Sequence, residues 1–181
     1  MLRYKLLVVC LVFVSVLNAQ FDNIEFIENK GQWDKRVKFL GRVNSGEFYV
    51  QQNGFMVVQH NPSDWARVAD AAHRHNGNEN YDKTNEVGIV RSHAFQVQFL
   101  NGNKTPELVA DKPLPGYNNY FIGNDPLKWV SNCKVYQGIT LKDVYPNVDV
   151  RYYSNNGAVK YDLIVKPGAD ISRIALKYEG T

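Results

Sequence analysis

The sequence predicts a mainly β protein, an antiparallel β-sandwich-like domain with one short helix. Three features of the 181-residue chain lead to this prediction. Short runs rich in β-branched and aromatic residues recur along the chain, several of them alternate apolar with polar side chains, and clusters of Gly, Asn and Pro separate them. Short strands with turn signals between them are typical of sandwiches and related antiparallel folds.

The N-terminus has the composition of a secretory signal peptide. A basic start is followed by an apolar run over residues 6–17 and by a small residue, Ala19, at the expected cleavage position. A transmembrane helix needs about 20 apolar residues, so this run is too short to be a good anchor. We therefore expect residues 1–19 to be removed, and residues 20–181 to form a single β-rich domain without a membrane span.

The first half of this domain contains three predicted strands joined by turns. Val37–Leu40 and Glu47–Val50 flank the turn residues Asn44–Gly46, and Gly54–Val58 follows a Gln-Asn-Gly hairpin signal. Such closely spaced runs predict neighbouring antiparallel strands.

One helix is predicted after these strands. Ser63 can cap its first turn. Apolar side chains then recur at helical spacing, at Trp65, Val68, Ala69 and Ala72. The following residues, about 73–90, are polar and rich in Asn and Gly, and we expect a variable loop there.

The second half contains a further set of strands. His93–Leu100 alternates apolar and polar side chains, as a half-buried strand does. Val148–Tyr153 and Val159–Val165 are joined through Asn156–Gly157, the dipeptide most typical of a tight hairpin turn. Ala175–Tyr178 is the last predicted strand.

The segment Leu114–Pro126 combines two prolines, two glycines, three asparagines and three aromatic residues within its length. That composition excludes a helix and favours turns with unusual backbone angles. Its large apolar side chains need a place to be buried. We therefore predict a shaped, turn-rich segment held against a core by Tyr117, Tyr120, Phe121 and Ile122.

The charge balance argues against a nucleic-acid partner. Two of the 21 basic residues and none of the 18 acidic residues lie in residues 1–19, which leaves 19 basic against 18 acidic residues. Nucleic acids require clustered basic charge, and a nearly neutral chain does not supply it.

No residue pattern predicts a catalytic, metal-binding or cofactor-binding site. His73 and His75 are spaced like zinc ligands, but they lie where a helix enters a polar loop and have no paired Glu or Cys. Asp149 and Asp162 lie on neighbouring strands and could form a hydrolase pair, yet their alternation with apolar residues favours a solvated sheet surface. Cys133, the one cysteine of the mature chain, is expected to be a buried apolar residue.

Four motifs occur in order along the mature chain. They are Glu28–Trp33, Leu114–Pro126 followed by Trp129, Tyr145–Asp149 followed by Lys160–Asp162, and Val165–Asp170 followed by Tyr178–Gly180. Together they resemble the N-terminal domain, of unknown function, of large secreted Bacteroidota-type proteins. In those proteins SBBP β-propeller repeats often follow, and a type IX secretion or gliding-motility sorting domain ends the chain.

The resemblance implies a cellular location and accompanying domains, and it does not imply a reaction. It implies export to the periplasm, the cell surface or the extracellular space, and it supplies no catalytic residues. It also implies that the domain continues beyond Thr181, so that residues 20–181 are incomplete at the C-terminus.

Aromatic residues are the remaining indication of function. Eleven tyrosines and three tryptophans exceed the needs of a small core, and amphipathic rings suit interfaces and sugar faces. The candidate binding or interface residues are Trp33, Tyr117, Tyr120, Trp129, Tyr152 and Tyr153. Because Tyr152 and Tyr153 are adjacent on a strand, one of them must face away from the core.

The sequence thus favours a non-catalytic structural or interaction module of a secreted or cell-surface bacterial protein. Its expected partners are downstream domains of the same protein or other cell-surface proteins. A carbohydrate-binding module that uses exposed aromatic residues is the alternative, with glycans as partners, and an unrecognised hydrolase is the third.

Overall fold

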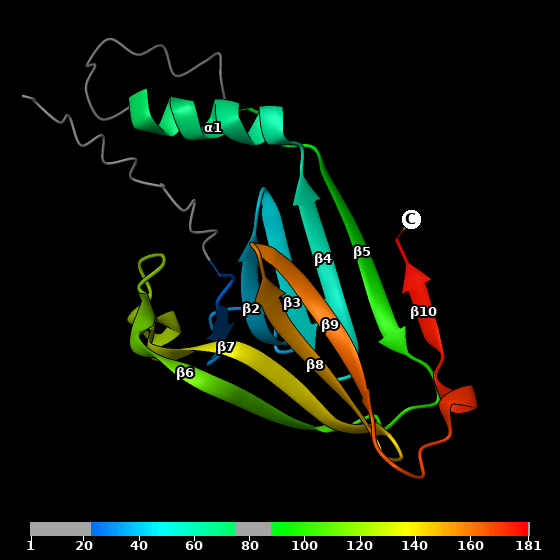
Figure 1. Cartoon of the computed structure of the whole chain (residues 1–181). Helices are drawn as coiled ribbons and strands as arrows, with labels where there is room; N and C mark the ends of the chain where they lie inside the picture. Colours follow the sequence, from blue (N-terminus) through cyan, green and yellow to red (C-terminus); the bar gives the residue numbers. More distant parts are fainter. Residues whose placement is uncertain (1–22, 75–87, 181) are drawn as a thin grey trace, which may run out of the picture.

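The computed structural model describes residues 23–74 and 88–180 and shows ten antiparallel strands and one α-helix (Figure 1). The mainly β prediction is confirmed. A sandwich of two separate sheets is not confirmed, because the strands are joined into one sheet that curls on itself (Figure 1). The predicted signal peptide, His75 and most of the predicted variable loop lie outside the described residues.

The strands predicted from alternation are all present, with ends shifted by a few residues. In chain order the strands are β1 (Phe26–Glu28), β2 (Val37–Val43), β3 (Gly46–Gln51), β4 (Gly54–His60), β5 (Ser92–Phe99), β6 (Glu107–Tyr120), β7 (Val130–Tyr145), β8 (Val148–Asn155), β9 (Ala158–Val165) and β10 (Leu176–Glu179). The order across the sheet is β10-β5-β4-β3-β2-β1-β7-β8-β9, and β6 lies along β7.

The long strand β7 gives the sheet its curl. One edge of β7 pairs with β6 over most of its length. The other edge is shared: β1 pairs with Val135 and Tyr136, and β8 pairs from Gly138 onward. Because β1 and β8 leave the same edge in succession, the β1–β5 and β8–β9 strands can face one another (Figure 1).

The main core lies between these two groups of strands. The ring of Phe48 on β3 stacks on Phe55 of β4 at 4.9 Å between centroids, and Tyr152 of β8 lies 5.5 Å from Phe48. Side chains of this size each contribute about 1.5–3 kcal/mol when fully buried. The other buried members are Phe26, Val50, Val97, Phe99, Ile139, Leu141, Val144, Tyr145, Val148 and Val150.

The predicted helix is present as α1, which spans Pro62–Arg74 and begins earlier than expected. Asn61, not Ser63, caps it: the Asn61 Oδ1 atom accepts hydrogen bonds from the amides of Ser63 at 3.0 Å and Asp64 at 3.1 Å. A proline at the first helical position favours this earlier start. The buried Asp64 carboxylate accepts from Arg91 at 2.8 Å and so attaches α1 to the segment before β5.

The turn-rich segment Leu114–Pro126 is partly a strand. Its first half is the end of β6, where two register shifts accommodate the irregular backbone, with Gly116 at φ 97°. Only the remainder, including the 3-10 turn Pro126–Lys128, is a loop. The predicted burial of Tyr117, Phe121 and Ile122 is wrong, since these side chains are 57%, 61% and 70% exposed.

Candidate functional site

The six aromatic residues predicted to bind lie in different environments. Trp33 and Tyr120 pack edge to face at 5.3 Å between centroids, in a second, smaller cluster that also holds the fully buried Cys133. Tyr152 is completely buried in the main core, so it cannot serve as a surface aromatic. The adjacent Tyr153 faces away from that core, as alternation along a strand requires.

A cluster of exposed apolar side chains occupies the end of the β6–β7 hairpin. We call it the aromatic tip; its members are Tyr117, Phe121, Ile122, Leu127 and Trp129, which are 57%, 61%, 70%, 95% and 43% exposed. This hairpin end projects from the sheet (Figure 1). Tyr117 and Trp129 were predicted from sequence as site residues, whereas the exposure of the other members was not.

The aromatic tip is an ordered surface. The Phe121 and Trp129 rings lie 5.5 Å apart between centroids. The Trp129 indole nitrogen donates to the Gly123 carbonyl oxygen at 3.1 Å, and the Asp125 carboxylate accepts from the Leu127 amide at 3.1 Å. These contacts hold apolar side chains in the solvent. Burying these side chains against another surface would be favourable, because it removes apolar area from water.

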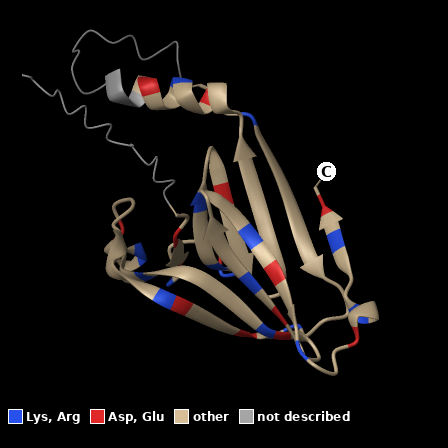
Figure 2. Cartoon of the chain, in the orientation of Figure 1, with Lys and Arg blue, Asp and Glu red and all other residues tan. Residues whose placement is uncertain are grey.

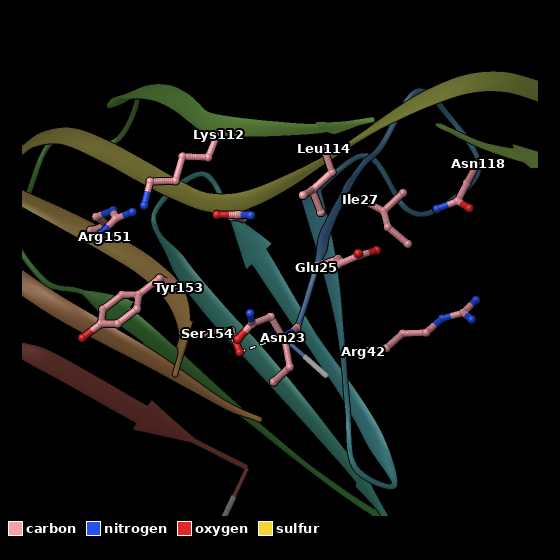
Figure 3. A pocket seen from close by; sticks show the side chains of 12 residues that line it. Asn23, Glu25, Ile27, Arg42, Lys112, Leu114, Asn118, Arg151, Tyr153 and Ser154 are labelled. Carbon is pink, nitrogen blue, oxygen red and sulfur yellow. Dashed lines mark hydrogen bonds between the residues drawn. The ribbon is translucent and has the colours of Figure 1, made fainter. Parts of the chain in front are cut away.

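A polar cleft lies where β1 and β8 part from the shared edge of β7. Gln137 stands between the two pairings, and the Ile24 amide closes the far side by donating to Ser154 Oγ at 2.9 Å. The cleft has a volume of about 750 Å³ and is lined from β1, β2, β6, β7 and β8. Figure 3 shows Tyr153 and Arg151 on its β8 side and Glu25 on its β1 side.

The charges of the cleft are unevenly paired. The Arg151 guanidinium donates to the Asp111 carboxylate at 2.9 Å and lies 5.3 Å from the centroid of the Tyr153 ring. In the described part of the chain, neither Arg42 nor Lys112 has a carboxylate partner within ion-pair distance. Two cations of the cleft are therefore available to a ligand.

Lys112 has an unusual backbone. Its φ is 50°, in the left-handed region that costs most residues about 1 kcal/mol or more. Every other described non-glycine residue with positive φ is Asn, Asp or Ser, whose short side chain can bond the local backbone. The left-handed turn at Lys112 directs its side chain into the cleft (Figure 3).

The two carboxylates considered for a hydrolase, Asp149 and Asp162, lie in different environments. Asp149 is 1% exposed, and its oxygens accept from Lys142 Nζ at 2.9 Å and Lys166 Nζ at 2.8 Å. Asp162 stands opposite Arg151 in the β8–β9 register and is exposed. Asp149 is therefore buried and ion-paired with two lysines. The solvated surface position expected from alternation is wrong for this residue.

Among residues 23–74 and 88–180, no cluster of three His, Cys, Asp or Glu side chains has a geometry that could hold a metal ion. Burial raises the pKa of the Cys133 thiol. Within those same ranges, no helix is long and apolar enough to span a membrane.

The fold and its surfaces define a curled antiparallel β domain with an apolar tip and a polar cleft. The chain belongs to the DUF7948 family, a domain of unknown function, whose family model matches residues 26–181. Comparisons with curated proteins and with solved structures find no match.

Proposed function

We propose that this domain is a non-catalytic interaction module of an exported bacterial protein, and that it docks through the aromatic tip. The carrying observation is the exposure of five large apolar side chains on one projecting hairpin end. Isolated exposed apolar residues are common on proteins, but five on one hairpin end, two of them with rings 5.5 Å apart, indicate an interaction surface. Partners are further domains of the same polypeptide or other proteins of the cell surface.

Site-specific photo-crosslinking in the producing cell tests this proposal. A photoreactive phenylalanine analogue placed at Leu127, the most exposed tip residue at 95%, should crosslink to a protein surface. The same analogue at Lys104, an exposed loop position away from the tip, is the matched control. A crosslinking pattern at Leu127 that equals that at Lys104 would exclude docking through the tip.

Export is the second part of the proposal, and it rests on the composition of residues 1–19. The mature protein should begin at Gln20 or Phe21. N-terminal sequencing of protein recovered outside the cytoplasm checks this, and a retained Met1 with membrane association would contradict it. The motifs shared with secreted Bacteroidota-type proteins support a context of SBBP repeats and a sorting domain, which the downstream reading frame would reveal.

We do not propose a nucleic-acid partner, because Lys and Arg are interspersed with Asp and Glu along the strands (Figure 2). A glycan partner is the second candidate function. One observation favours it: Tyr153, among the aromatic residues expected to contact sugars, lines a polar cleft.

A further inference from the structure

We infer that the cleft between β1, β6 and β8 binds an acidic saccharide, with Lys112 and Arg151 receiving the sugar carboxylate. This inference names the ligand class for the glycan candidate, and it is independent of docking through the aromatic tip. It rests on the arrangement of charges, on the backbone of Lys112 and on the neutral polar groups of the cleft.

Lys112 and Arg151 form the anion-binding part of the cleft. Arg151 is oriented in advance by the Asp111 carboxylate at 2.9 Å and by the Tyr153 ring at 5.3 Å. The Lys112 side chain extends toward Arg151 from β6 (Figure 3). An ammonium group without a carboxylate partner beside a fixed guanidinium suits a ligand carboxylate, because hydrogen bonds between ionised groups are the strong ones.

The backbone of Lys112 supports a binding role. A left-handed conformation is unfavourable for lysine, whereas glycine or asparagine would adopt it readily. Strained residues of this kind concentrate at functional sites, where the side chain placed by the strain has a task. For Lys112 we infer that this task is to bind an anionic group of a ligand in the cleft.

The remaining lining fits a hydroxylated ligand. Amide side chains at Asn23, Asn118 and Gln137 offer both donors and acceptors, as sugar hydroxyl groups require. Glu25 accepts hydrogen bonds only, and so suits a hydroxyl group that donates. A ligand with one carboxylate among several hydroxyl groups satisfies both features.

The size of the cleft is adequate for such a ligand. Its volume of about 750 Å³ lies within the roughly 300–1,000 Å³ typical of small-molecule sites. Tyr153 and Leu114 supply apolar surface for the C–H face of a sugar ring.

NMR titration with three trimers tests the inference, on residues 20–181 carrying Val165→Lys, a substitution outside the cleft that opposes self-association through the strand edge. Trigalacturonate should produce saturable shifts at the backbone amides of Lys112, Gln137 and Ser154. Maltotriose, which lacks the carboxylates, should bind at least about tenfold more weakly. Triglutamate, which has carboxylates but no sugar hydroxyl groups, should also bind more weakly than trigalacturonate.

Two variants of Lys112 separate binding from folding. Lys112→Met should weaken trigalacturonate binding about tenfold, whereas Lys104→Met removes the same charge from an exposed loop outside the cleft and should not. Lys112→Asn should also lose binding, while its melting temperature stays equal to or above that of the wild type because Asn tolerates φ near 50°.

Several results would overturn the inference. Absence of saturable shifts with trigalacturonate would exclude the site, and equal binding of maltotriose would exclude carboxylate recognition. Equal binding of triglutamate would make the cleft a peptide site, and equal losses in the Lys112 and Lys104 variants would indicate general charge attraction. None of these results affects the crosslinking expected at Leu127.

Discussion

Asp149 shows how one buried charge joins three parts of the chain. Its carboxylate accepts hydrogen bonds from the Asp143 amide at 2.9 Å, from Lys142 on β7 and from Lys166, which directly follows β9. Burial raises the pKa of Asp149, but the hydrogen bonds from the Asp143 amide, Lys166 and Lys142 outweigh burial and hold it at about 2. The charged form is therefore the one that stabilises the fold.

Asp149→Asn should lower the free energy of unfolding at neutral pH by about 2 kcal/mol. A depressed pKa stabilises the fold fully above the ordinary value of 3.8, and this stabilisation is lost as the pH falls toward about 2. Urea unfolding at several pH values should show the variant and wild type converging in acid.

Asp34→Asn is the control, because the pKa of Asp34 is also about 2 but its ion pair with Arg36 is exposed. Its stability should hardly change, since exposed ion pairs contribute little. Equal losses in the two variants would mean that burial does not set the contribution of Asp149.

Removing the hydroxyl group should have opposite effects on stability at two buried tyrosines. The Tyr152 hydroxyl is buried with no hydrogen-bond partner among the described residues, and burial raises its pKa. The Tyr145 hydroxyl donates to the Ala175 carbonyl oxygen at 2.7 Å and accepts from the Ala175 amide at 3.2 Å. Tyr152→Phe should leave stability unchanged or raise it, whereas Tyr145→Phe should cost about 1 kcal/mol. Thermal unfolding of both variants checks this, and a larger loss at Tyr152 would refute it.

At the scale of elements, the β8–β9 hairpin is determined by its own turn. Asn156 and Gly157 have φ of 51° and 73°, as a type I′ turn requires, and Asn155 pairs with Ala158. The turn is local, so two residues are enough to predict it.

Gly157→Val should destabilise the protein by about 1–2 kcal/mol, because a β-branched side chain would occupy a left-handed conformation. Ala158→Val places the same side chain one residue later, at an exposed strand position, and should be tolerated. Differential scanning calorimetry compares the two, and equal melting temperatures would show that the turn does not require glycine.

Strands β6 and β7 are the elements that local pattern could not predict. Pro113 and Gly116 interrupt the β6 sequence, and the β6–β7 ladder has two register shifts, so the alternation used to recognise strands is broken. Each becomes a strand because the other supplies its hydrogen-bond partners over a long antiparallel ladder. The exposed tip at their end was mispredicted for the same reason, since burial of Phe121 and Ile122 depends on what the hairpin meets.

At the scale of the whole molecule, the sheet has three edge strands among the described residues. There β9 pairs with β8 alone, β10 with β5 alone and β6 with β7 alone. Side chains of β9 and β10 nevertheless meet: a hydrogen bond with Tyr178, together with burial, raises the pKa of Tyr161 to about 12. Val165 and Tyr178 are 48% and 56% exposed, so apolar surface remains beside unpaired backbone.

Residues 20–181 alone should therefore self-associate and bind a hydrophobic dye. Val165→Lys should reduce the association measured by light scattering, because a charge on an edge strand opposes pairing with another chain. Ile89→Lys also replaces an exposed apolar side chain, 82% exposed but outside the strands, and should have little effect. A compact wild-type monomer that binds no dye would show that the open edges need no partner.

The sequence by itself determined the mainly β class, most of the strands, the helix and the Asn156–Gly157 turn. Each of these depends on residues close together in the chain, through alternation, helical spacing or positive φ. It also indicated that Tyr152 and Tyr153 face opposite ways and that Cys133 is buried.

Only the tertiary structure decided that the strands form one curled sheet, that Asp149 is buried between two lysines, and that Lys112 and Arg151 share a cleft with Gln137. The cleft exists because β1 and β8 leave one edge of β7 on either side of Gln137. That arrangement joins segments more than a hundred residues apart, as the hydrogen bond from Ile24 to Ser154 does. Pairings over such distances leave no periodic trace in the sequence, because each strand satisfies its pattern equally well beside several neighbours.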